Sequence, residues 1–162
     1  MANIIAWNVR GLNNPNKQED IRIFLQKQEV GLVALLETKV KRENIEEVAK
    51  RLFGGWEWET NVAYNPKVRI WVAWRNRAYH LRVLEATDQL MHYKVHQVHT
   101  HKICYITFVY GMNTNALRQS LWGDLRRITG QMQMAWGVLG DFNATLYLEE
   151  RLGRTYSLSR TP

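Results

Sequence analysis

The spacing of apolar residues changes at Gly54-Gly55, and this change restricts the folds open to the chain. Before the two glycines, short apolar runs at residues 3–9 and 30–36 predict strands. Each run is followed by apolar residues spaced as on one helix face, at 15–29 and 42–52. The run at 30–36 is continuous, which is typical of a strand covered on both faces. This part of the chain therefore predicts the order strand, helix, strand, helix.

The chain after the glycines has the composition of β-structure. Turn signals separate several segments rich in aromatic and β-branched residues, which predict a meander of antiparallel strands at residues 56–61, 68–74, 80–84, 91–98 and 102–110. A third helix is predicted at 115–129, with Gly130 as its stop, and a last strand at 134–139. The complete order of elements is that of an α/β protein.

Length and composition suit one globular domain. A chain of 162 residues with 46% hydrophobic and 23% charged residues is not expected to be disordered. Its apolar runs fall far short of the roughly 20 residues that span a bilayer, and the first residues lack the long apolar core of a secretory signal. A single cysteine, Cys104, agrees with a reducing compartment and is expected to be a small buried residue. We therefore expect an intracellular protein, in the cytoplasm or nucleus, with no membrane partner.

The excess of positive charge lies in the later part of the chain. The 22 Lys and Arg residues outnumber the 15 Asp and Glu residues and give a net charge of +7. Residues 1–60 carry nine charges of each sign, whereas residues 61–162 carry thirteen basic and six acidic residues. A positive face there would favour polyanions such as DNA or RNA. The alternative is scattered solvated cations, since no three are consecutive.

Polar side chains with oxygen atoms follow three of the predicted strands. These residues are Asn8, Glu37, and Asp141 with Asn143. A carboxylate buried at the end of an apolar strand is costly without a partner, and a divalent cation is a common partner. Mg²⁺ prefers oxygen ligands, so Glu37 and Asp141 could bind it, while the asparagines orient a carboxylate or bind a phosphate oxygen. Each acid could instead be a helix N-cap, a turn residue or half of a salt bridge.

The segments around these residues resemble the endonuclease/exonuclease/phosphatase superfamily. In chain order they are WNVRGLNNPNK, LLETKV, FVYG with the Asn-rich loop and helix that follow, and GDFNATL. More narrowly, they are similar to the apurinic-endonuclease-like domain of plant LINE-type non-LTR retrotransposons. The resemblance runs from residue 3 to about residue 153. It departs before the segment IWVAW, where Val68 and Arg69 replace two glycines and the preceding turn is expected to differ.

This resemblance implies a DNase I-like fold, a two-layer β-sandwich flanked by helices, which cleaves phosphodiester bonds with Mg²⁺ or Mn²⁺. Glu37 matches the metal-ligand glutamate and Asn8 the asparagine beside it. Tyr110 matches the tyrosine that hydrogen-bonds the scissile phosphate. Asp141 matches the aspartate that positions the attacking water, and Asn143 the asparagine that stabilises charge on the phosphoryl oxygens. Without the resemblance, Tyr110 would be interpreted as a residue at the rim of the core.

The resemblance also predicts an incomplete second half. The family's Ser-Asp-His signature and the aspartate before it have no counterpart, because no histidine or aspartate follows Asn143. Positioned acid–base groups typically contribute ~10²–10⁴ in rate. We therefore expect a truncated domain at 1–153 and a tail at 154–162, with impaired or absent catalysis and a role in protein or nucleic-acid binding. The alternative is an active metal-dependent DNA-nicking endonuclease of the LINE type.

Five histidines lie between His80 and His101. His99-Thr100-His101 predicts a hairpin between two strands. The histidines and Cys104 also suggest zinc, but their spacing matches no structural zinc pattern, and alternate residues of a strand point to opposite faces. Solvated hairpin histidines are the favoured interpretation. We do not expect any of them to replace the family's catalytic histidine.

An incomplete sandwich would leave apolar side chains and a sheet edge uncovered. We therefore expect a homodimer, a bound protein partner or reduced stability.

Overall fold

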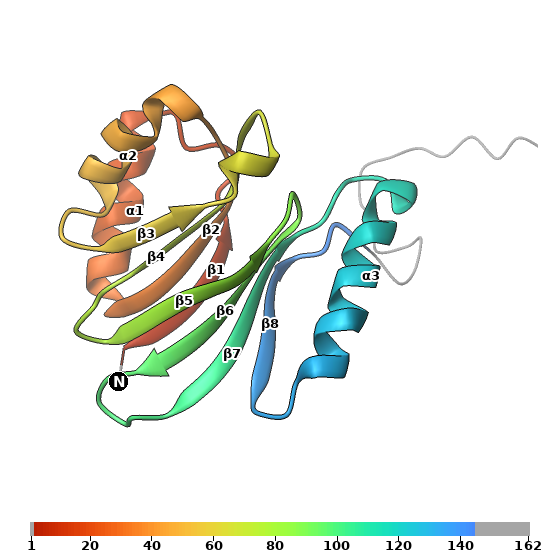
Figure 1. Cartoon of the computed structure of the whole chain (residues 1–162). Coiled ribbons are helices and arrows are strands. Elements are labelled where there is room, and N and C mark those ends of the chain that lie inside the picture. The colour runs from red at the N-terminus through yellow and green to blue at the C-terminus, as the bar shows by residue number, and fades with distance from the viewer. Residues whose placement is uncertain (1, 145–162) are drawn as a thin grey trace, which may run out of the picture.

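The computed structural model describes residues 2–144, in which two four-stranded sheets pack face to face (Figure 1). The first sheet has the order β1-β2-β4-β3, with β1 at Asn3–Asn8, β2 at Val30–Lys41, β4 at Lys67–Trp74 and β3 at Glu57–Thr60. The second has the order β5-β6-β7-β8, with β5 at Tyr79–Ala86, β6 at Leu90–Gln97, β7 at Ile103–Tyr110 and β8 at Trp136–Asp141. The predicted α/β sandwich flanked by helices is confirmed.

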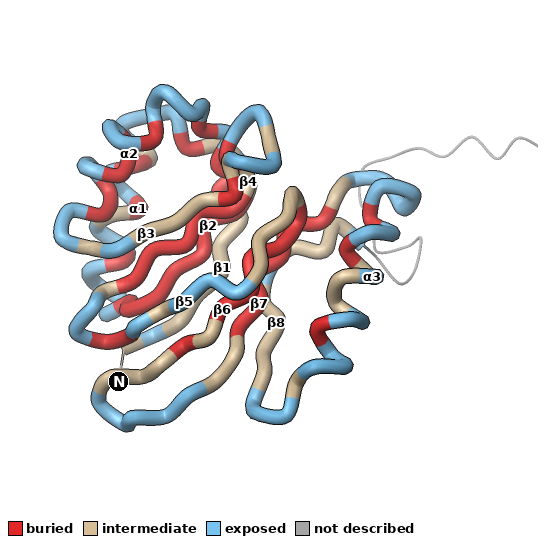
Figure 2. The backbone as a smooth tube through the Cα atoms, viewed as in Figure 1, coloured by how far each residue is buried: buried red, intermediate tan, exposed pale blue. Residues whose placement is uncertain are grey.

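Helices cover the outer face of each sheet. Helices α1 (Pro15–Lys27) and α2 (Ile45–Leu52) pack on the first sheet, and α3 (Asn115–Gln131) packs on the second (Figure 1). A third apolar cluster lies between the sheets and includes the fully buried Leu32, Ile70, Tyr93 and Phe108. The central strands β2 and β4 are therefore buried on both faces, as Figure 2 shows.

Helix starts follow the local sequence. The Asn14 side chain accepts a hydrogen bond from the Asn16 backbone N–H at 2.9 Å, and Pro15 takes the first helical position, the place in a helix that these residue types favour. The predicted stop at Gly130 is wrong, because α3 continues through it to Gln131. Gly130 does not adopt the positive φ that a glycine cap uses, and the Met132 N–H closes the last turn onto the Thr129 carbonyl.

Strand β2 is longer than the predicted strand at 30–36. The pairing with β4 shifts register between Leu36 and Val40 and then resumes, with Val40 opposite Val68 and Lys41 opposite Lys67. Glu37 therefore lies in an irregular stretch within a strand and not at the strand's carboxyl end. An irregularity of this kind redirects side chains while the sheet continues.

The predicted single meander is also wrong. Strands β3 and β4 pair with each other and with β2 in the first sheet, and only β5, β6 and β7 form a meander, in the second sheet. Strand periodicity identifies each strand but not its partner, because pairing depends on contacts that are distant in sequence. The last strand, β8, runs parallel to β7 and extends to Asp141, two residues past its predicted end.

Strands β1 and β8 are edges of their sheets and lie beside each other across the sandwich. Their apolar side chains Ile4, Ala6 and Leu139 are only partly buried against the core between the sheets. The expected partner or second copy stays a prediction, and the boundary at 153/154 lies outside the described residues. No helix of residues 2–144 combines the length and apolar character needed to cross a membrane.

Candidate functional site

The polar residues predicted at the strand ends meet at one end of the sandwich. The Asn8 Nδ2 donates a hydrogen bond to Asp141 Oδ2 at 2.8 Å, which links β1 of the first sheet to β8 of the second. The backbone N–H of Asn143 donates to Asp141 Oδ1, also at 2.8 Å. Both oxygens of the Asp141 carboxylate therefore accept hydrogen bonds, and its orientation is fixed.

The loop after β8 is held against the segment after β7. Asn143 Nδ2 donates to the Gly111 carbonyl at 2.6 Å, and the Gly111 N–H donates to the Asp141 carbonyl at 2.8 Å. A Cβ on Gly111 would lie 2.4 Å from the Phe142 carbonyl oxygen, so only glycine permits this approach. Tyr110, directly before Gly111, is thereby placed next to Asn143.

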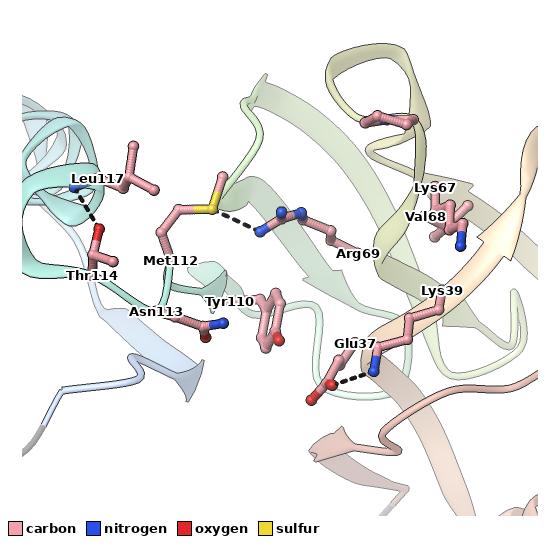
Figure 3. A pocket seen from close by; sticks show the side chains of 11 residues that line it. Glu37, Lys39, Lys67, Val68, Arg69, Tyr110, Met112, Asn113, Thr114 and Leu117 are labelled. Atoms are coloured by element: carbon pink, nitrogen blue, oxygen red, sulfur yellow. Dashed lines mark hydrogen bonds and ion pairs between the residues drawn. The ribbon is translucent and has the colours of Figure 1, made fainter.

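Glu37 projects from the irregular part of β2 toward Tyr110 (Figure 3). Its Oε1 pairs with Lys39 Nζ at 2.8 Å, and the Lys39 side chain is 55% exposed. Burial alone would raise the pKa of Glu37, but hydrogen bonds from Lys39 and Asn8 and the charge of Lys39 hold it below its usual value. Glu37 is therefore ionised at neutral pH.

Tyr110 ends β7 and is only 8% exposed. Burial, followed by the negative charge of Glu37, raises the pKa of its hydroxyl, although the Asn143 side chain opposes this shift. A protonated phenol at this place can donate a hydrogen bond to an anionic oxygen. The structure thus brings together all five residues singled out from the sequence: Asn8, Glu37, Tyr110, Asp141 and Asn143.

The backbone is strained at this end of the molecule. Of the six non-glycine residues with positive φ in the described chain, four lie here: Arg10 at 49°, Glu37 at 56°, Lys39 at 57° and Asn143 at 48°. A left-handed conformation costs such residues about 1 kcal/mol or more each. Strain of this kind concentrates at functional sites, where the surrounding structure holds it in place. Its location therefore supports a site here independently of residue type.

A cavity of about 620 Å³ opens beside Glu37 and Tyr110. Its lining includes three cations, Lys39, Lys67 and Arg69, and the side chain of Met112 (Figure 3). Lys67 and Met112 carry no signal in the sequence, and Arg69 stands out there only as a replacement for glycine. That replacement was the one available signal, because nothing local in the sequence places β4 beside the end of β7.

The donor set fits a divalent ion held by few protein ligands. No group of three or more His, Cys, Asp or Glu residues within 2–144 is arranged to hold a metal ion. Mg²⁺ commonly uses one or two carboxylates and completes its shell with water and substrate oxygens. Glu37, ionised and beside the open cavity, is suited to such a role, with Asn8 next to it.

The histidines lie away from this site, on β5, β6 and the hairpin before β7. His96 lies near both His80 and His101, with ring centroids 5.9 and 6.0 Å apart. The expectation that strand alternation would separate the histidines is therefore wrong for His80 and His96, because they are cross-strand neighbours, while His101 lies in the hairpin before β7. Cys104 instead packs, partly buried, against the core between the sheets.

No family model matches the chain, and no curated protein sequence matches it. Three similar solved structures are the endonuclease domain of TRAS1, a telomere-specific non-LTR retrotransposon; the human Nocturnin catalytic domain; and the AP endonuclease LMAP from Leishmania major. Their identities to the chain are 12%, 13% and 16%, with TM-scores of 0.67, 0.60 and 0.65. The matches cover 88%, 87% and 85% of this chain but 61%, 64% and 54% of theirs.

These likenesses establish the fold, which is that of the endonuclease/exonuclease/phosphatase, or DNase I-like, structures. The chain spans less than two thirds of the length of each of the three structures.

Proposed function

We propose that the chain binds a divalent metal ion and a phosphodiester of nucleic acid at the site formed by Asn8, Glu37, Tyr110, Asp141 and Asn143, and that hydrolysis is its reaction. The main support is the junction of Asn8 with Asp141 beside Glu37 and Tyr110. The printed names of two similar structures, a retrotransposon endonuclease domain and an AP endonuclease, agree with this class of reaction. So does the sequence resemblance to LINE-type endonucleases.

Each residue has a role that its contacts allow. Bound Mg²⁺ or Mn²⁺ would supply positive charge next to a phosphoryl oxygen. Glu37 would hold the ion, and Asn8 orients Asp141. The fixed Asp141 carboxylate positions a water molecule for attack. Tyr110 donates a hydrogen bond to the phosphate, and the Asn143 amide, anchored on Gly111, presents its remaining N–H to a phosphoryl oxygen.

A second candidate function is metal-dependent binding without turnover. One observation favours it: none of the five histidines, all of which lie in the described part of the chain, is at the site. A missing acid–base group typically lowers the rate by ~10²–10⁴. In this case the protein would act by binding nucleic acid or a protein partner.

Two measurements on the same samples separate these candidates. Nicking of supercoiled DNA and of an abasic-site oligonucleotide is followed during a Mg²⁺ titration, and binding of that oligonucleotide is followed by fluorescence anisotropy. Glu37→Gln and Asp141→Asn are compared with Glu46→Gln and Asp20→Asn, which change exposed residues of α2 and α1.

Metal-dependent nicking that only the two site variants lose supports hydrolysis. Metal-dependent binding without nicking, lost in the same variants, supports the second candidate. Nicking or binding that is equal in all four variants contradicts both.

A further inference from the structure

We propose that the cavity beside the site is the subsite for the nucleotide adjoining the scissile phosphate, and that Lys67 and Arg69 bind the second phosphate of that nucleotide. This inference rests on the proposed function, which it extends to the substrate class. It makes the preferred ligand a nucleotide with two phosphates rather than a nucleotide with one.

The cavity has the size and position of a ligand subsite. Its volume of about 620 Å³ falls within the range usual for small-molecule sites. Glu37 and Tyr110 belong both to the candidate site and to the cavity lining, so a ligand held by them extends into the cavity. Lys67 and Arg69 of β4 both line the cavity, and in Figure 3 the Arg69 side chain extends toward Met112.

The charges in the cavity favour an anion. Glu37 is the single carboxylate in the cavity lining, and it is paired with Lys39, one of the three cations there. Among the described residues, neither Lys67 nor Arg69 is in an ion pair. Two cations without carboxylate partners thus face the cavity. An arginine guanidinium binds phosphate through two parallel hydrogen bonds, which makes Arg69 the stronger contributor.

Arg69 is held close to the site by weak contacts that a phosphate can replace. Its guanidinium carbon lies 5.9 Å from the centroid of the Tyr110 ring, and its Nη1 donates to Met112 Sδ at 2.8 Å. A thioether is a weak acceptor, and a phosphate oxygen is a much stronger one. The Arg69 backbone is anchored by its N–H to Asn61 Oδ1 at 3.2 Å, and Asn61 is fully buried.

The remaining lining suits the uncharged part of a nucleotide. Met112 and Leu117 present apolar surface to the cavity, and Leu117 is 59% exposed. Helix α3 begins at this wall, where Thr114 accepts a hydrogen bond from the Leu117 N–H. The positive end of a helix dipole adds to the attraction of phosphate.

The test compares two ligands that differ by one phosphate. Binding of thymidine 3′,5′-bisphosphate and of thymidine 5′-monophosphate, each with Mg²⁺, is measured by isothermal titration calorimetry. We expect the bisphosphate to bind at least about tenfold more tightly, as one charge-assisted contact provides. Arg69→Gln and Lys67→Gln should reduce this ratio several-fold. Arg77→Gln, the same change at an exposed residue of the turn between β4 and β5, should leave it unchanged.

The inference is overturned by equal affinities for the two nucleotides, by binding of neither at millimolar concentration, or by an undiminished ratio in both cavity variants. Lys67 is exposed, so Lys67→Gln remains informative if Arg69→Gln fails to fold. The outcomes also separate the two proposals. If the bisphosphate binds more tightly than the monophosphate but no DNA is nicked, the subsite is supported and hydrolysis is contradicted. If nicking depends on Glu37 but the two nucleotides bind with equal affinity, the nuclease function is supported and the subsite is contradicted.

Discussion

Asn8 and Asp141 share a hydrogen bond of 2.8 Å although 133 positions separate them in the chain. The bond joins an edge strand of one sheet to an edge strand of the other. The side-chain oxygen Oδ1 of Asn8 in turn accepts a hydrogen bond from the Arg10 backbone N–H at 3.0 Å, so the side-chain amide has a fixed orientation. One side chain therefore positions the Asp141 carboxylate and connects the two sheets at the site.

Asn8→Ala should leave an oxygen of the partly buried Asp141 carboxylate without its donor. We expect the free energy of unfolding to fall by about 1–3 kcal/mol, the usual cost of such a loss. Urea denaturation measures this change. Asn44→Ala is the matched control, because the Asn44 side chain makes no capping bond at the start of α2. Equal stability of the two variants would contradict the structural role of Asn8.

Lys39→Ala should strengthen metal binding. The Lys39 ammonium pairs with Glu37 Oε1 and competes with a divalent ion for that carboxylate. Because Lys39 is largely exposed, we expect a modest gain in Mn²⁺ affinity, about tenfold at most. Glu37→Gln should abolish the binding.

Free Mn²⁺, followed by its electron paramagnetic resonance signal, measures both effects. Lys41→Ala, at the exposed end of β2, is the control and should leave Mn²⁺ affinity unchanged. Weaker binding by Lys39→Ala would show that the lysine assists the site instead.

Tyr110→Phe should lower phosphodiester turnover by about 10²-fold, as expected when one donor to a developing charge is lost. Its thermal stability should change little, because the ring and its packing are retained. Burial and the charge of Glu37 raise the pKa of Tyr110, so the loss of turnover caused by ionisation of this hydroxyl should occur at a higher pH than for an ordinary tyrosine. Tyr64→Phe, at an exposed tyrosine, should retain full turnover.

Gly140→Ala should be strongly destabilising. Gly140 has φ +147°, and a Cβ there would lie 2.0 Å from the Val109 carbonyl oxygen on the neighbouring strand. We expect the free energy of unfolding to fall by more than about 2 kcal/mol. Gly123→Ala is the opposite case, because space is open around this position of α3, and it should stabilise by up to about 1 kcal/mol. Chemical denaturation of the two variants gives the comparison.

His92 should make the fold sensitive to mild acid. It is buried on β6, its Nδ1 lies 2.8 Å from Thr107 Oγ1, and burial lowers its pKa although Glu85 opposes the shift. Below its usual pKa of about 6.5, the unfolded chain therefore binds more protons than the folded chain, and stability decreases as the pH falls.

Urea denaturation at pH 7.5 and 5.5 should show this decrease in the natural chain and a smaller one in His92→Gln. His99→Gln, in the exposed hairpin, should retain the full decrease. An equal decrease in His92→Gln would contradict the role of His92.

Local patterns were sufficient to predict the elements and not their pairing. Asn14 and Pro15 define the start of α1 because capping is a contact between near neighbours. The irregularity at Glu37 and the position of β4 between β2 and β3 could not be predicted, because both are set by strands far apart in sequence. Gly130 has a residue type that suits a stop, but its backbone remains helical.

The candidate site could be predicted only in part, because some of its residues carry a local sequence pattern and others are brought together by segments distant in sequence. Asn8, Glu37, Asp141 and Asn143 were singled out because they follow apolar runs, whereas Tyr110 received a role only through the resemblance. The catalytic roles of all five residues stay predictions. Lys67 carries no local signal, since exposed cations on a strand are common, and Arg69 stands out in the sequence only as a replacement for glycine. They become significant only through the cavity that they share with Glu37.

The hydrogen-bonded junction between the sheets also has a thermodynamic consequence. Groups on β1 and β2 belong to one sheet, and groups on β7 and β8 belong to the other, so a ligand that contacts both halves bridges separate structural layers. Ligand binding at the site and the packing of the two sheets against each other are then linked equilibria. Saturation with ligand therefore raises the melting temperature of the whole molecule. Variants that loosen the layers should correspondingly weaken affinity, even when the altered side chain never touches the ligand.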